Sequence, residues 1–207
     1  MIKHFAWMGT VALLFAPSLA VGAANTDPDW PCVQRKVPDL SVAQVWTAGE
    51  LPAIAADWNK DEKLAELVSV VAARRTSIED AEKQITAYVA TLPAAQANEK
   101  LAQIFQGLFD TLNHERQQVI TGISRYAGKQ RDMAADVRKS SAEVDQLRRQ
   151  ADVDPAELTK RSQQLTWQTR IFQERVHSLT FVCEVPTIIE QRLYTLSKVI
   201  AQLMSKS

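Results

Sequence analysis

The sequence predicts an all-α fold: a three-helix bundle base, a projecting antiparallel coiled-coil hairpin and an N-terminal wrapping arm. Two long runs of heptad-spaced apolar residues flank the turn sequence Asp152-Val153-Asp154-Pro155, which predicts two long helices folded back on each other. Only six glycines occur in 207 residues, and this argues against a turn-rich β fold. We expect residues 61–207 to form the helical body and residues 25–60 to form the arm.

The second long helix shows the clearest pattern. Its apolar residues keep a seven-residue spacing that is interrupted only near Pro186: Leu158, Leu165, Phe172, Leu179, Leu193 and Ile200. The other core position is mixed, with Ser162, Thr169, Val176 and Cys183. The spacing predicts a coiled-coil helix, and Pro186 predicts a kink because proline lacks the backbone N–H.

The first long helix carries a matching apolar seam: Leu101, Phe105, Leu108, Leu112, Val119, Ile123, Tyr126, Met133, Val137, Val144 and Leu147. Val119 and Ile123 are four residues apart where the heptad requires three, which is a stutter. If the helices reverse at Val153, positions whose numbers add to about 306 face each other, since both rise equally per residue. Ile123 then faces Cys183, and the stutter lies level with Pro186, unless the two irregularities are unrelated.

Residues 61–92 have the spacing of one further helix, capped by Asp57 or Asn59 and ended by Pro93. The tight break at Pro93 favours an antiparallel turn over a kink. That arrangement puts Leu64 near Ile123, so that three helices meet in the base. Residues 124–182 then project as two helices over roughly 40 Å.

The arm is rich in proline and tryptophan, including Trp30, Trp46 and Trp58. Such prolines resist long helices, although Ser41 can cap a short one over residues 41–47. Large aromatic side chains in an irregular segment predict that it lies on a surface that buries them. We therefore expect the arm to wrap the bundle and to be held by Cys32.

Residues 1–24 have the pattern of a secretory signal peptide with cleavage near Ala23 or Ala24; a membrane anchor is the alternative. No later segment is apolar enough to span a membrane, so we expect an exported, periplasmic protein. Cleavage removes Lys3 and no acidic residue, which leaves a net charge of about −1. This balance shows no basic footprint for nucleic acid.

An oxidising compartment favours pairing of the two cysteines, Cys32 and Cys183; two buried free thiols are the alternative. A disulfide closing so long a loop would stabilise the fold by roughly 4 to 5 kcal/mol in the chain-entropy model. We expect it where the base gives way to the projecting hairpin, with Trp30 buried beside it.

The segment Trp30-Pro31-Cys32-Val33-Gln34-Arg35-Lys36-Val37-Pro38 resembles one found in uncharacterised exported proteobacterial proteins. The resemblance covers under a tenth of the chain and implies no function.

No catalytic, metal or cofactor motif is present. His114 and His177 are the two histidines that follow the signal peptide, and the hairpin pairing holds them roughly 20 Å apart. The sequence has no haem-attachment, phosphate-loop or dinucleotide-binding pattern. We therefore expect a protein that is not an enzyme and that needs neither cofactor nor metal.

The function that these features favour is that of an exported interaction or scaffold protein whose coiled-coil hairpin meets a protein partner in the cell envelope. Either the side of the hairpin or its tip, with Arg148, Arg149, Lys160 and Arg161, is the working surface. Exposed heptads also leave self-association through the coiled coil open.

Two alternatives remain. A periplasmic ligand- or ion-binding bundle, acting as sensor or carrier, would use polar residues near the apolar seam: Arg74, Arg75, His114, Glu115 and Arg192. A redox protein would use Cys32 and Cys183 as reactive thiols.

Overall fold

The computed structural model describes residue 27 and residues 29–205, so the expected signal peptide lies outside the described residues. The all-α fold is confirmed, and the described residues contain no strand. The elements in chain order are α1 (Val42–Val45), the 3-10 helix η1 (Ala53–Lys60), α2 (Glu62–Ala72), α3 (Ile78–Ala90), α4 (Ala94–Arg148) and α5 (Pro155–Met204). None of the helices in the described part of the chain has the length and apolar character needed to cross a membrane.

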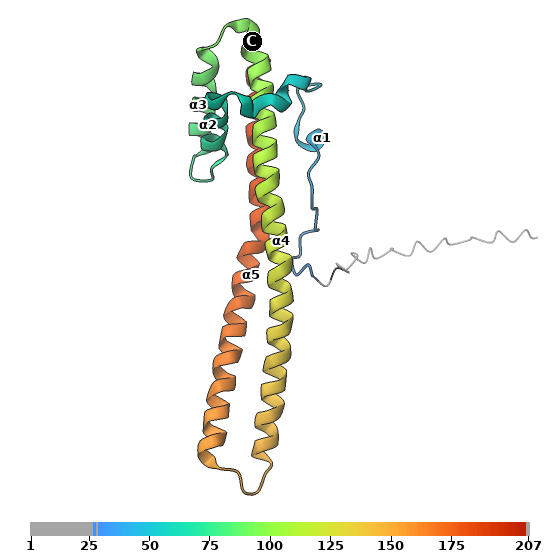
Figure 1. Cartoon of the computed structure of the whole chain (residues 1–207), viewed down its shortest axis with the longest axis vertical. Coiled ribbons are helices and arrows are strands. Elements are labelled where there is room, and N and C mark those ends of the chain that lie inside the picture. Colours follow the sequence, from blue (N-terminus) through green and yellow to red (C-terminus); the bar gives the residue numbers. More distant parts are fainter. Residues whose placement is uncertain (1–26, 28, 206–207) are drawn as a thin grey trace, which may run out of the picture.

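The two longest helices, α4 and α5, form the predicted antiparallel hairpin (Figure 1). The Asp154 side chain accepts a hydrogen bond from the Ala156 amide at 2.9 Å and so caps α5, which begins at Pro155. Pro186 lies inside α5, and Figure 1 shows this helix changing direction where it leaves the base. The predicted turn and kink therefore agree with the structure.

The single helix expected over residues 61–92 is wrong, because the chain reverses at residues 73–77 and forms two helices, α2 and α3. Ser77 caps α3 by accepting a hydrogen bond from the Asp80 amide at 3.0 Å. The Thr76 hydroxyl donates to the Val70 carbonyl at 2.7 Å and closes the loop. The apolar residues Val71 and Ile78 are seven apart, so the helical spacing continues across the break and conceals it.

This reversal also corrects the expected position of Leu64. The Lys100 ammonium lies 2.8 Å from a carboxylate oxygen of Asp61, which puts the start of α2 beside the start of α4. Leu64 packs in the base core and not near Ile123. Asp61 caps α2 by accepting from the Leu64 amide at 3.2 Å, so the expected caps Asp57 and Asn59 are wrong. The antiparallel turn at Pro93 is as predicted (Figure 1).

The base, which we define as the part of the molecule formed by α2, α3 and the ends of α4 and α5 next to them, holds the main core. The base has four helices where the sequence predicted three, because the expected helix over residues 61–92 is two. Buried apolar residues come from all four: Leu64, Val68 and Val71; Ala81 and Ile85; Leu101, Ile104, Phe105, Leu108 and Leu112; Ile189, Leu193, Leu196 and Ile200. Each helix here has two or more neighbours, so a wide apolar face is enclosed.

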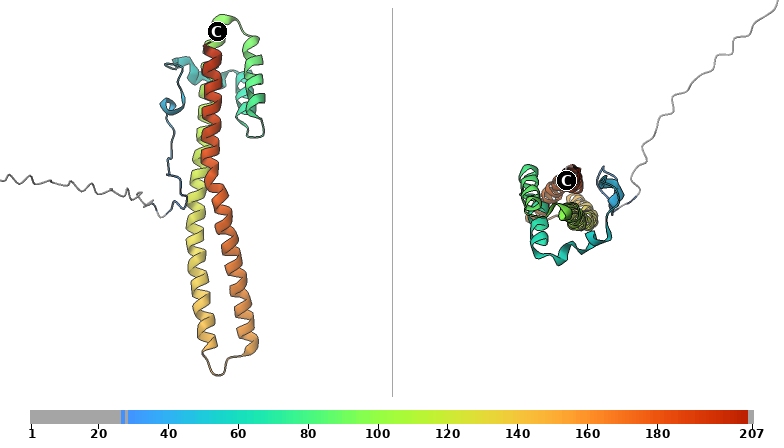
Figure 2. Two further views of the ribbon diagram at one scale, coloured as in Figure 1. Left: turned by 180° about the vertical axis from the view of Figure 1, so that it is seen from behind. Right: turned by 90° about the horizontal axis from the view of Figure 1, so that it is seen from above.

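The arm wraps α4, as expected, passing from the α1 side to the α2 side (Figure 2, right). Trp46 packs on Phe105 with ring centroids 4.2 Å apart, and the Ser197 hydroxyl donates to the Val45 carbonyl at 2.6 Å. Gly107 allows the closest approach, because a Cβ atom there would lie 2.8 Å from the Trp58 ring. The arm is thus part of the packing of the base.

The projecting hairpin (residues 124–182) buries much less. In α4 the buried residues beyond Ile123 are Ala127, Gln130 and Val144. In α5 every buried residue lies at or beyond Cys183. Two helices without further neighbours enclose only a narrow strip, as the diluted seam predicts.

Candidate interaction surface

The border between the base and the projecting hairpin is marked by the predicted disulfide. Cys32 and Cys183 are bonded, with Cα atoms 5.5 Å apart. Trp30, Ile120 and Ile123 bury the bridge, which confirms both the level of Cys183 and the place of Trp30. The Trp30 indole donates to the Gln34 carbonyl at 2.6 Å, so its polar atom is satisfied.

The arm is held at this level by polar contacts as well. Arg116 is 3% exposed and donates to the Val37 carbonyl at 2.6 Å, and it lies 3.6 Å from Glu190. Burial lowers the pKa of the Arg116 guanidinium from its ordinary value, and Glu190 opposes this shift. Asp27 lies 2.9 Å from Lys36, whose hydrogen bond lowers the pKa of that carboxyl group. The Arg116 contact joins the arm to α4, while the Asp27–Lys36 pair closes the arm on itself.

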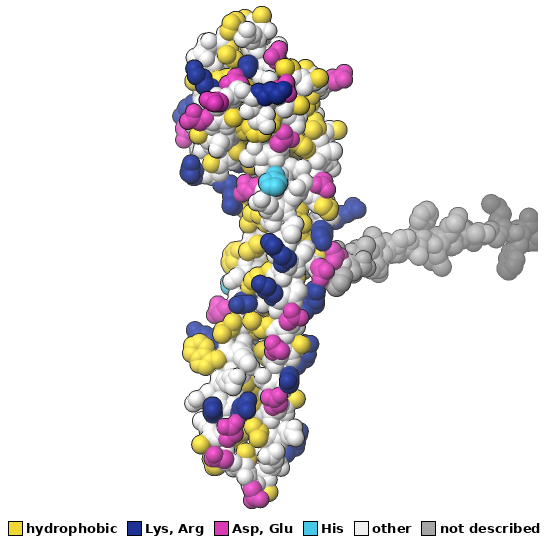
Figure 3. Space-filling view, viewed as in Figure 1, with side chains coloured by type: hydrophobic (Ala, Val, Ile, Leu, Met, Phe, Trp, Pro, Cys, Tyr) yellow, Lys and Arg dark blue, Asp and Glu magenta, His cyan; other side chains and the backbone are white. Residues whose placement is uncertain are grey.

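Beyond this border, α5 presents an uncovered face, which we call the exposed α5 face: Trp167, Ile171, Glu174, Ser178 and Val182. Their spacings of four and three residues put them on one side of the helix. Trp167 is 63% exposed, and Ile171 and Val182 are also exposed. Figure 3 shows hydrophobic side chains reaching the surface along this side of the hairpin, between charged groups. A tryptophan so exposed on an ordered helix is a feature of interaction surfaces.

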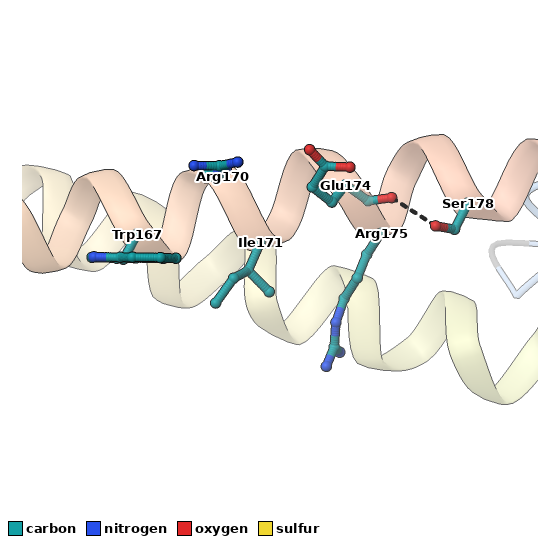
Figure 4. A pocket seen from close by; sticks show the side chains of 6 residues that line it. All are labelled: Trp167, Arg170, Ile171, Glu174, Arg175 and Ser178. Atoms are coloured by element: carbon teal, nitrogen blue, oxygen red, sulfur yellow. Dashed lines mark hydrogen bonds between the residues drawn. The ribbon is translucent and has the colours of Figure 1, made fainter.

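Two hollows follow this face. The first is a shallow depression of about 350 Å³ around Trp167, Ile171 and Ser178 (Figure 4). The second is an apolar cleft of about 280 Å³ between α4 and α5, whose lining includes Gly122, Tyr126 and Val182. Ser178 lines both, so the two hollows are neighbours along α5, and the second lies nearer the disulfide.

Some polar atoms inside the hairpin are buried without a hydrogen-bond partner. Both polar atoms of the Gln130 amide are buried without a hydrogen-bond partner, as are the Ser124 hydroxyl and the Gln168 carbonyl oxygen. Each such atom forgoes hydrogen bonds that it makes in water, and this costs free energy. These atoms therefore reduce the net stability that contacts within the hairpin provide.

The tip residues form local ion pairs. Arg148 lies 3.2 Å from Asp145, and Arg161 lies 2.8 Å from Glu157. Arg149 and Lys160 are exposed. Each pair lies within one helix, so two of the four basic residues are matched by a carboxylate of their own helix.

The residues suggested for a ligand site separate into two groups. Arg74 lies 3.4 Å from Glu115, which lines a cleft of about 400 Å³ with Trp58 and Thr111. Arg192 donates to the Val71 and Ala72 carbonyls and so satisfies the end of α2; burial lowers the pKa of its guanidinium. His114 contacts Gln118 on the exposed side of α4, and Arg75 is exposed. The structure brings Arg74, Glu115 and Arg192 to the end of α2 but joins neither His114 nor Arg75 to them.

The exposed α5 face is what the heptad analysis missed. That analysis followed the row that faces α4, while Trp167, Ile171, Ser178 and Val182 form a second row on the same helix. The signal was available, because two large apolar residues, Trp167 and Ile171, stand four apart outside the heptad seam.

No cluster of three or more metal-ligating side chains occurs in the described part of the chain.

Compared with family models, curated proteins and solved structures, the chain matches none of them at a significant level.

Proposed function

We propose that this protein is exported to the periplasm and acts as a helical interaction or scaffold protein in the cell envelope. The base is its stable body, and the projecting hairpin is its working surface. The observation that carries the proposal is the uneven burial of α5, in which all buried residues lie at or beyond Cys183. The remaining turns keep Trp167 and Phe181 at least 60% exposed.

The uneven burial favours a partner because a long apolar surface in water is costly unless something covers it. The core residues of the base lie outside residues 124–182, so the hairpin is not needed to complete that core. An ordered extension that the core of the base does not need is suited to reaching a second protein.

Two observations support export. The first is the signal-like pattern of residues 1–24. The second is the Cys32–Cys183 disulfide, since such bonds persist in oxidising compartments.

Capture from envelope extract tests the proposal. The mature protein is compared with a variant in which a short linker replaces residues 124–182, after circular dichroism has verified that the deleted protein is folded. Trp167→Ala and Tyr194→Ala form a matched pair, because both aromatic residues are exposed on α5 but Tyr194 lies in the base. We expect an envelope protein to be captured by the wild type and by Tyr194→Ala, and to be lost with Trp167→Ala and with the deletion. Capture that survives the deletion would remove the hairpin from this role.

A second candidate is the binding of an apolar ligand in the cleft between α4 and α5. The cleft includes Ile123, Leu179 and Val182, and its volume of about 280 Å³ is near the lower end for ligand sites. A panel of apolar metabolites in a thermal-shift assay tests it. A real ligand should raise the Tm, and Gly122→Leu should abolish that rise, since a Cβ at Gly122 points into open space. A panel without any shift counts against this function.

A further inference from the structure

One side of α5 runs continuously from the base into the projecting hairpin. It carries Ile171, Ser178, Val182, Val185, Ile189, Leu196 and Leu203, at spacings that keep one side of a helix. In the base, the last four belong to the core that α2 and α3 complete or pack against it. In the hairpin, Ile171 and Val182 are exposed. The apolar side thus extends further than the elements that cover it.

The uncovered part also carries a charge pattern that complements itself. Arg170 and Glu174 are four residues apart and so lie in one row beside Ile171. Figure 4 shows both on the same side of α5, with Ile171 and Arg175 extending on the other. In the part of the chain that the structure describes, neither Arg170 nor Glu174 forms a salt bridge. The Arg170 guanidinium lies over the Trp167 ring, 6.0 Å from its centroid, and so meets no carboxylate there. Opposite charges in one row, neither of them in a salt bridge, suit a second helix that runs antiparallel.

We propose that two copies of this chain associate through the exposed α5 face, with their α5 helices antiparallel and a twofold axis at the level of Phe172. Arg170 then faces Glu174 of the partner subunit, and the symmetry repeats this pair. Ile171 packs on the partner's Ile171 across the axis. Trp167 lies beside the partner's Ser178, a small side chain that leaves room for the indole. The inference rests on the proposed function, since it makes the hairpin an interaction surface and names a second copy as its partner.

The antiparallel orientation follows from the same charges. A parallel twofold pair would put the row of Arg170 and Glu174 against the partner's other flank, which carries Ile171 and Arg175, so Arg170 would not meet the partner's Glu174. In the antiparallel register, the first residue of α5, Pro155, lies level with the partner's Ile189. The apolar side of α5 would then be covered by α2 and α3 in the base and by the second α5 in the hairpin.

Analytical ultracentrifugation of the oxidised mature protein, at up to about 100 µM and low ionic strength, tests the inference. We expect a reversible dimer. Arg170→Glu or Glu174→Arg alone should raise the dimer Kd by about tenfold, because each creates two like-charge contacts. The double variant should return to within about threefold of the wild type, since the exchanged charges match again.

Apolar substitutions give the matched control. Ile171→Glu should abolish the dimer, while Tyr194→Glu, exposed on α5 within the base, should leave the Kd unchanged. All these positions are exposed, so each variant should keep the circular-dichroism spectrum and Tm of the wild-type monomer.

A protein that stays monomeric over this range overturns the inference, and so does a dimer that the single charge reversals do not weaken. Weakening that the double variant fails to reverse also overturns it, because the two side chains would then not face each other. A monomer that still captures an envelope protein through the hairpin would remove this inference and leave the proposed function. A dimer with the predicted charge pattern and no envelope partner would support this inference and contradict the proposed envelope partner.

Discussion

The base and the projecting hairpin are built on the same two helices but differ in how much those helices bury. Leu193 and Ile200 are fully buried in the base, while Leu165 and Phe172, at the same heptad position, are only partly buried in the hairpin. These four residues share one heptad position, so that position alone does not account for the difference. The number of neighbouring elements does.

Those neighbours are different in kind. In the base, α2, α3 and the arm surround α4 and α5, and the core extends around both helices. In the hairpin each long helix has one neighbour, and a two-stranded contact covers only its seam. An apolar row on a helix therefore indicates which side is to be buried. Whether that side becomes core or interface depends on whether another part of the same chain or a second protein covers it.

The disulfide at the border between the regions should give the largest effect. Replacing both Cys32 and Cys183 with serine should lower the free energy of unfolding by roughly 4 kcal/mol, because the unfolded chain regains the entropy of a long loop. Urea unfolding measures this change. Limited proteolysis should show faster cleavage in residues 29–36, while residues 37–60 stay protected by Arg116 and by the packing of Trp46 and Trp58. An arm that is equally resistant without the bridge would show that packing alone holds it.

A matched leucine pair tests the difference in burial directly. Leu193→Ala should destabilise the protein by about 2 to 5 kcal/mol, because it opens a cavity in the base. Leu165→Ala, at the same heptad position in the hairpin, should cost less than about 1.5 kcal/mol, since Leu165 is only half-buried. Urea unfolding of both variants gives the two values. Equal costs would mean that the hairpin is as much part of the core as the base.

Two glycines of α4 should respond with opposite signs. Gly107→Ala should destabilise by about 1 to 3 kcal/mol, because the new Cβ would meet the Trp58 ring and the Val68 side chain at 2.8 Å. Gly122→Ala should stabilise by about 0.5 to 1 kcal/mol, since nothing lies within 4 Å of its Cβ position and alanine favours a helix. Thermal unfolding should therefore move in opposite directions, and a stabilising Gly107→Ala would contradict the close packing of the arm.

The smallest effect concerns ion pairs. The hydrogen bond from Lys100 holds the pKa of Asp61 below its ordinary value of 3.8. This lowered pKa means that the ion pair stabilises the fold above that value and that the contribution is lost as the pH falls through the folded pKa. Asp61→Asn keeps a residue suited to capping, so it should lower stability by less than about 1 kcal/mol at neutral pH, and the difference should shrink toward pH 3.

Glu157→Gln is the control for the hairpin. It removes the exposed partner of Arg161 at the tip and should change the Tm less than Asp61→Asn does at neutral pH. Tm measured against pH for the two variants tests the order, and a reversed order would contradict it.

The sequence by itself determined the elements that depend on local or covalent chemistry. Heptad spacing identified the two long helices and the sides on which they meet, because side-chain direction follows from helical geometry alone. Asp154 and Pro155 fixed the reversal through capping. Two cysteines and the facing of Ile123 and Cys183 were enough to predict the bridge and the burial of Trp30.

Tertiary structure alone decided where the chain reverses at residues 73–77 and which apolar sides are covered. The reversal has no glycine or proline, and its one local signal is the cap that Ser77 gives to α3. The periodicity from Val71 to Ile78 suits both one helix and two, so packing against α4 and α5 selects between them. The sequence marked Trp167 and Ile171 as an apolar row on α5, but it did not determine that this row stays exposed. The α2–α3 loop lies beside Arg192, which donates a hydrogen bond to the Ala72 carbonyl. Beyond this loop α2 and α3 no longer cover α5, so its apolar residues become exposed. The sequence does not show this limit, because the burial of a residue depends on its neighbours in the fold.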